Sequence, residues 1–177
     1  MDALIVQELV VASDYGQIYV GDPEGLDETS PQTEEDNSLQ RSLDDAHESR
    51  RFVGYDGGTV NILTPSQYNW TAPLRLEVFE EPPPLDADGW DHIAEVPLPA
   101  PSGKLYFQAS GGGTLHETMI SPGIYRARIS GRDFVAGVGE IEGRESWRIQ
   151  LWPAEESEPS LLKYWDGWDL MSPAEPL

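Results

Sequence analysis

The sequence predicts a mainly β protein, an antiparallel β-sandwich with one inserted surface helix. Roughly eight or nine short stretches alternate apolar and polar residues, and turn residues separate them at fairly regular spacing. Only one stretch has helical periodicity, and no internal repeat is present. The 177 residues suit a single β domain spanning residues 1–177. Within it we expect an acidic, helix-bearing insertion at about 21–52 and a polar tail at about 166–177.

The centre of the predicted sheet is residues 121–154. Pro122-Gly123 indicates a turn, and the residues after it alternate apolar side chains with Arg126 and Arg128. This period of two is typical of a strand with one buried and one solvated face, and it recurs over residues 147–151. We therefore expect two antiparallel strands here. The residues expected in the core are Leu76, Phe107, Tyr125, Ala127, Ile129, Trp147, Ile149 and Leu151.

The first fifty residues contain two predicted strands, a loop and a helix. Residues 4–12 and 15–20 are apolar and separated by a short turn, which predicts an N-terminal hairpin. Residues 21–35 contain two prolines and many carboxylates, which predicts an exposed loop. Residues 38–50 then place Leu39, Leu43 and Ala46 on one helical face. Acids precede this stretch and arginines close it, as the helix dipole favours.

The later strands are shorter. We expect them at residues 59–63, 72–80, 92–99, 104–110 and 115–120, with a last strand or helical turn at 161–165. Three prolines at 82–84 end the second of these strands, because proline cannot continue a hydrogen-bonded ladder. Residues 166–177 read as a polar tail.

Charge and cysteine content narrow the possible functions. The formal net charge is −21, from 32 acidic and 11 basic side chains. This charge repels nucleic acid and anionic membranes, and it favours basic protein partners. There is no cysteine, which excludes disulfides and thiol nucleophiles. No apolar run approaches the ~20 residues of a membrane span, and residues 1–13 lack the basic start of a signal peptide. We therefore expect a cytoplasmic protein.

The sequence contains no catalytic signature, so we expect a protein that is not an enzyme. The three histidines, His47, His92 and His116, do not have the spacing of a metal site. A nucleophile elbow and a phosphate-binding loop are missing. Acid pairs such as a glycosidase uses are abundant, but the sequence does not select one of them. These pairs are Glu34-Glu35, Asp44-Asp45, Glu80-Glu81 and Glu155-Glu156.

Two features favour a ligand-binding β-sandwich as an alternative. Asp86, Asp88 and Asp91 surround Gly89, and carboxylates on a tight loop are calcium ligands; no other cofactor is expected. The chain also has six tryptophans, and exposed indoles stack on sugars or anchor protein partners. They are Trp70, Trp90, Trp147, Trp152, Trp165 and Trp168, of which Trp152 falls on the face of its strand opposite the core.

Several segments resemble a known family. They are ELVVASDYGQIYV near the N-terminus, KLYFQAS, PGIYRARIS and ESWRIQLWPA. Together they resemble the small β-domains of the competence protein J family, which inhibits a DNA-entry nuclease. They are also similar to uncharacterised actinobacterial proteins that end in an "IQLWPA" strand. These are turn and strand motifs, so the resemblance implies a β fold and a nuclease partner but transfers no functional residue.

The acidity and the resemblance together predict an acidic protein-binding domain that inhibits a basic partner such as a nuclease. An acidic face can reproduce the phosphate field that a nuclease attracts. We expect the contacts to crowd the acidic segment before and on the predicted helix, at Glu34, Glu35, Asp36, Asp44 and Asp45.

Overall fold

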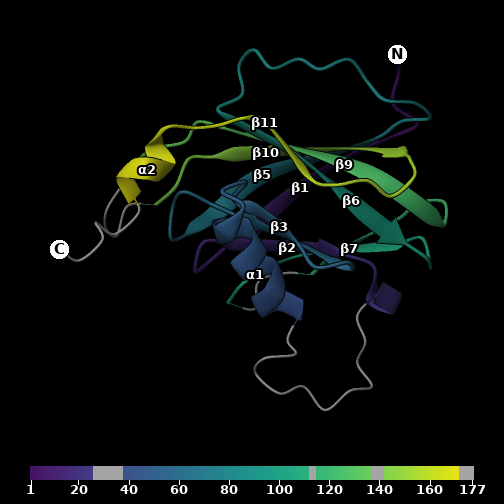
Figure 1. Ribbon diagram of the computed structural model, residues 1–177, viewed down its shortest axis with the longest axis horizontal. Helices are drawn as coiled ribbons and strands as arrows, with labels where there is room; N and C mark the ends of the chain where they lie inside the picture. Colours follow the sequence, from purple (N-terminus) through teal and green to yellow (C-terminus); the bar gives the residue numbers. More distant parts are fainter. Residues whose placement is uncertain (26–37, 112–114, 137–141, 172–177) are drawn as a thin grey trace.

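A computed structural model of the chain describes residues 1–25, 38–111, 115–136 and 142–171, in which two β-sheets pack over one hydrophobic core (Figure 1). Sheet A has six strands in the spatial order β1 (Ile5–Ser13), β5 (Asn69–Val78), β10 (Ser146–Pro153), β9 (Gly123–Arg132), β6 (His92–Ala100) and β11 (Ser160–Lys163). Sheet B has five, in the order β3 (Val53–Tyr55), β4 (Thr59–Leu63), β2 (Gln17–Gly21), β7 (Lys104–Ala109) and β8 (His116–Met119). The helical segments are η1 (Pro23–Gly25), α1 (Ser38–Glu48) and α2 (Gly167–Met171).

The core lies where the inner faces of the two sheets meet. All eight residues that the sequence places inside are buried, each at most 4% exposed. In β9 and β10 the buried apolar residues alternate as expected, and Ile129 pairs directly with Ile149 across the antiparallel ladder. The predicted mainly β fold with two sheets is therefore confirmed.

The predicted purely antiparallel arrangement is wrong, because β5 and β10 run parallel. Their register pairs Leu74 with Trp147 and Val78 with Leu151. β1 pairs with β5, and β9 with β10, in the antiparallel sense, so sheet A is mixed. A period of two identifies a strand but carries no information on its direction or its neighbour.

The predicted N-terminal hairpin is also wrong. β1 pairs with β5 in sheet A, whereas β2 pairs with β4 and β7 in sheet B. The turn between them carries the chain from one sheet to the other, with positive φ angles at Tyr15 (53°) and Gly16 (67°). Gly16 is held in sheet B by bonds from its own N–H to Gln67 and from the Thr64 N–H to its carbonyl, both 2.8 Å. Two apolar strands joined by a short turn can thus belong to facing sheets.

The predicted helix forms α1 and packs on the outer face of sheet B, against β3 and β4. Ser42 and Ala46 are fully buried in this contact. The helix lies so close to β3 that a Cβ at Gly54 would be 1.6 Å from the Ser42 carbonyl oxygen. The loop predicted over residues 21–35 lies mainly outside the described residues, of which Pro23–Gly25 forms η1.

The predicted tail begins with the short helix α2, whose Trp168 is only 4% exposed. Trp168 stacks on Phe52 with ring centroids 4.0 Å apart and interplanar angle 5°. The start of the predicted tail, Gly167 and Trp168, is therefore buried against the domain, whereas Asp169 and Leu170 are exposed; residues 172–177 lie outside the described part.

Candidate functional site

The outer face of sheet A carries an arginine pair on β9 that the alternation predicts to be solvated. Arg126 and Arg128 are instead 8% and 6% exposed. Both bond the carboxylate of Glu95 on the neighbouring β6, with Nε–oxygen distances of 3.2 and 2.8 Å. The Arg128 guanidinium also lies over the Trp152 ring, 4.9 Å from its centroid. This is why Trp152, on the predicted outward face, is only 5% exposed.

Two segments cover the arginine pair, and we name them the first strap (residues 80–91) and the second strap (residues 154–159). Arg128 donates from Nη1 to the carbonyl oxygens of Pro83 and Pro84, at 3.0 and 3.3 Å. Arg126 donates from Nη1 to the carbonyl oxygens of Ser157 and Glu158, at 3.2 and 3.0 Å. Figure 1 shows the first strap, in teal, arching above sheet A. The buried arginines therefore fasten both straps to the sheet.

The parallel pairing of β5 and β10 brings the two straps together. Parallel strands end at the same edge of a sheet, and the Phe79 N–H donates to the Leu151 carbonyl at 2.8 Å where the first strap begins. Neither strap contains a lysine or arginine. Their exposed glutamates form what we call the acidic ridge: Glu80, Glu81, Glu155, Glu156 and Glu158. Four of these five belong to acid pairs that the sequence could not rank.

One ridge carboxylate is also tied to sheet B. The Tyr55 hydroxyl on β3 donates to Glu156 Oε1 at 3.3 Å. Burial, together with the charge of Glu156, raises the pKa of Tyr55, so the hydroxyl keeps its proton at neutral pH. The second strap is thus held on both sides, by Arg126 and by Tyr55.

The predicted calcium ligands on the first strap have other partners. Asp86 forms a two-pronged ion pair with Arg148, at 2.5 and 2.8 Å, which lowers the pKa of Asp86. Asp91 accepts the backbone N–H of Phe134 at 3.0 Å, and Asp88 is exposed. Within the described residues, no group of three or more acidic or histidine side chains is placed to hold a metal ion. Calcium binding at this loop stays a prediction.

One of the two predicted partner contacts on the helix is compensated by an arginine. Glu34, Glu35 and Asp36 lie outside the described residues. The Asp45 carboxylate accepts bonds from Arg51 at 2.5 Å and from the Tyr55 N–H at 2.8 Å, so it serves the fold. Asp44 is exposed and accepts a bond from Gln40. Residues 38–51 contain three acids and three arginines, so this segment has a net charge of zero: Asp44, Asp45, Glu48, Arg41, Arg50 and Arg51. The excess negative charge of the chain therefore lies outside residues 38–51.

An aromatic cluster closes one end of the sandwich around His92, which is 1% exposed. Its Nε2–H donates to the Arg51 carbonyl at 2.5 Å, and its Nδ1 accepts the Trp165 N–H at 3.3 Å. This pair of bonds requires the neutral imidazole, and burial lowers the pKa of His92 accordingly. The ring is therefore a structural link between three segments.

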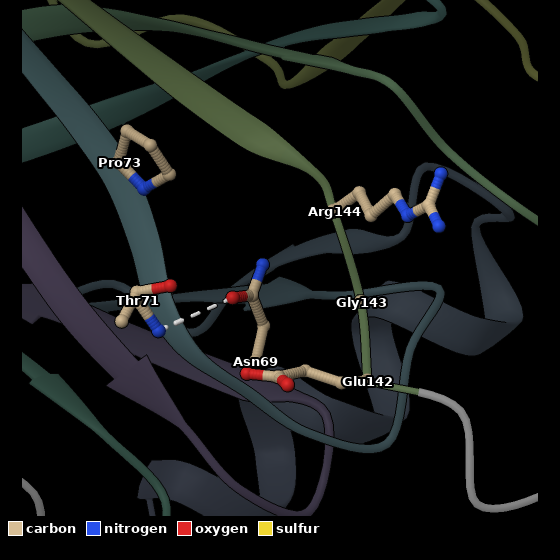
Figure 2. Close-up of a pocket in the computed structure, with 6 residues that line it drawn as sticks. All are labelled: Asn69, Thr71, Pro73, Glu142, Gly143 and Arg144. Carbon is tan, nitrogen blue, oxygen red and sulfur yellow. Dashed lines mark hydrogen bonds between the residues drawn. The ribbon is translucent and has the colours of Figure 1, made fainter.

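An open pocket of about 600 Å³ lies where β5 and the segment before β10 diverge (Figure 2). We name it the fork pocket; its lining residues are Asn69, Thr71, Pro73, Glu142, Gly143 and Arg144. Trp70, next to it in the chain, is 51% exposed, whereas the other five tryptophans are buried or half-buried. The sugar-binding alternative thus has a single largely exposed indole, and it stays a prediction.

Comparison with known proteins shows the fold and no family. No family model and no curated protein matches the chain. No described helix is long and apolar enough to cross a bilayer. Two solved structures share the fold. Crocagin biosynthetic gene J matches with a TM-score of 0.59 and 18% identity, over 85% of this chain and 98% of that one. ComJ from Bacillus subtilis, an inhibitor of the DNA-degrading activity of NucA, matches with a TM-score of 0.54 and 13% identity, over 86% and 98%.

Proposed function

We propose that this chain is an acidic protein-binding domain that docks on a basic protein and inhibits it. The acidic ridge is the observation that carries the proposal. It places five exposed carboxylates on two straps that contain no lysine or arginine. The fold likeness to ComJ favours a DNA-degrading nuclease as the partner. Under this proposal the chain binds without catalysing a reaction and needs no cofactor. The cytoplasmic location expected from the sequence stays a prediction.

The way in which the ridge is held suits it to this role. A nuclease attracts the phosphates of DNA with a positive cleft, and a fixed row of carboxylates presents a similar field. The buried arginines hold the strap backbones before any partner arrives. Binding then orders little additional chain, which reduces the entropic cost of association.

The proposal is tested with a nuclease from the same cell, by measuring its DNA cleavage and its association with the chain. The ridge variant replaces the five ridge glutamates with glutamine, which keeps size and hydrogen bonding. A matched control removes five exposed acids elsewhere: Asp2→Asn, Glu24→Gln, Glu48→Gln, Asp133→Asn and Asp166→Asn. We expect the ridge variant to associate about tenfold more slowly or worse at low salt, because steering charges act mainly on the association rate.

The control variant carries the same net charge, so it should lose much less. Raising the salt from 0.1 to 1 M shortens the screening length from about 10 to about 3 Å, and this should weaken the wild type more than the ridge variant. Equal losses in the two variants would show that only total charge matters. Absence of inhibition by the wild type would overturn the proposed function.

A further inference from the structure

The fork pocket exists because the parallel ladder between β5 and β10 stops at Leu74 and Trp147. The residue before Leu74 is Pro73, which has no N–H to donate, so the ladder does not continue through it. Before these residues the two segments of the chain diverge. The Asn69 side chain bridges them by donating a hydrogen bond to the Glu145 carbonyl, at 3.1 Å. At the far end of the pocket, the Gly143 N–H donates a hydrogen bond to the Tyr68 carbonyl, at 2.8 Å.

A buried carboxylate lies directly behind the pocket wall. Glu145 is 1% exposed, and Ser66 Oγ donates to its Oε1 at 2.5 Å. No lysine or arginine, all of which are in the described part of the chain, lies within ion-pair distance of it. A Cβ at Gly143 would come 2.1 Å from its Oε2, so glycine in the wall gives this carboxylate its place beside the pocket. The chain itself therefore supplies no cationic partner for this carboxylate, next to which the pocket lies.

The lining adds a second carboxylate and a hydroxyl. Figure 2 shows the Glu142 side chain turned towards Asn69 and Thr71, whereas Arg144 extends away from them. Glu142 is exposed and has no lysine or arginine within ion-pair distance. Asn69 Oδ1 accepts the Thr71 N–H at 3.3 Å, which keeps this part of the wall in place.

Two aromatic residues, Tyr68 and Trp70, flank the lining residue Asn69 in the chain. Trp70 is 51% exposed, and its ring lies 5.6 Å from that of Tyr68 at an interplanar angle of 31°. A guanidinium group combines charge with a flat apolar face, so it pairs with carboxylates and stacks on aromatic rings at once. One carboxylate in the pocket lining, a second buried behind its wall and an exposed indole next to the lining residues in the chain therefore match an arginine side chain better than a neutral sugar.

We propose that the fork pocket binds the guanidinium group of an arginine side chain presented by the basic partner. This inference rests on the proposed function only for the source of the arginine. Pocket and ridge lie at opposite ends of the same strand pair: the seven residue-to-residue steps from Pro73 to Glu80 span roughly 23 Å. An ordinary protein interface buries about 800 Å² on each side and covers that distance. The pocket thus adds a geometric anchor to a surface that otherwise attracts by charge.

The test titrates the ¹⁵N-labelled full-length chain with Nα-acetyl-arginine methylamide. The matched ligand is the citrulline analogue, which has nearly the same shape without the charge. We expect the Trp70 indole and the amides of Thr71 and Gly143 to shift with arginine, with a Kd in the roughly millimolar range that suits a single side chain. Citrulline should cause little shift.

Two variants locate the effect. Glu142→Gln should weaken arginine binding about fivefold, as expected for loss of one partly exposed ion pair. Arg144→Gln should strengthen it, because a neighbouring like charge is removed. Equal shifts with arginine and citrulline, or shifts confined to the ridge, would overturn the inference.

The probe needs no partner, so the two proposals can fail separately. Nuclease inhibition with an inert fork pocket would overturn the pocket assignment and leave the ridge in place. Arginine binding at Trp70 and Gly143 without any nuclease binding would retain the pocket and overturn the proposed function.

Discussion

Glu95 and Arg128 form a nearly buried ion pair on the outer face of sheet A, with 2.8 Å between Oε1 and Nε and side-chain exposures of 14% and 7%. The same carboxylate also receives Arg126. One glutamate thus pairs with both arginines that fasten the straps, so the order of the acidic ridge depends on a residue that lies beneath it.

Substituting Glu95 with alanine should therefore destabilise the domain and loosen both straps. Removing one partner of a buried pair leaves an uncompensated charge and costs roughly 3 to 5 kcal/mol. Urea unfolding measures the loss, and amide exchange of residues 155–158 reports on the second strap. Asp88→Ala, an exposed acid on the first strap, is the control and should change stability by less than about 0.5 kcal/mol. If the two variants were equally stable, the ion pair would have no role in holding the straps.

Substituting Gly54 with alanine should displace α1. The new methyl group would overlap the Ser42 carbonyl oxygen, a backbone atom of the helix that cannot rotate away. Overpacking of this kind costs roughly 1 to 3 kcal/mol or more. Gly123→Ala is the matched control, because the nearest atom to its Cβ would be a Tyr125 ring carbon at an ordinary 3.7 Å. Thermal unfolding of both proteins measures the difference, and a Gly54→Ala protein as stable as the wild type would contradict the close contact.

The strands of the core could be predicted because alternation directly reports burial on one face. Ile129, Ile149 and Leu151 are inside for that reason. The direction of β10 could not be predicted, since parallel and antiparallel neighbours require the same alternation. β3 has only three residues and α2 only five, so neither has a periodic signal of useful length.

The candidate site was visible in the sequence only as separate acid pairs. Glu80-Glu81 and Glu155-Glu156 lie more than seventy residues apart in the chain, and only the parallel strand pair brings them together. Arg126 and Arg128 look like solvated residues of a β9 face, because the segments that bury them are far away in sequence. The fork pocket has the weakest signal, a proline inside a strand, which indicates an interrupted ladder without showing what lies beside it.

Lowering the pH should destabilise the fold through His92, whose pKa is lowered by burial. The folded protein keeps the imidazole neutral, because a proton on Nδ1 would remove the acceptor for the Trp165 N–H. In the unfolded chain the pKa is about 6.5. Above that pH both states are neutral and the stability is complete. As the pH falls below about 6.5, the unfolded state binds a proton that the folded state does not, so stability falls by up to about 1.4 kcal/mol per pH unit until the folded pKa is reached.

Urea unfolding at pH 7.5 and 5.5 measures this effect in three proteins. His92→Gln should be less stable than the wild type at pH 7.5, since it loses ring packing, but its stability should change less between the two pH values. The control is His47→Gln, on the exposed face of α1, which should keep the pH dependence of the wild type. Carboxylates contribute equally to all three proteins, so the comparison isolates the imidazole. If His92→Gln and the wild type lost the same free energy on acidification, another group would carry the pH dependence.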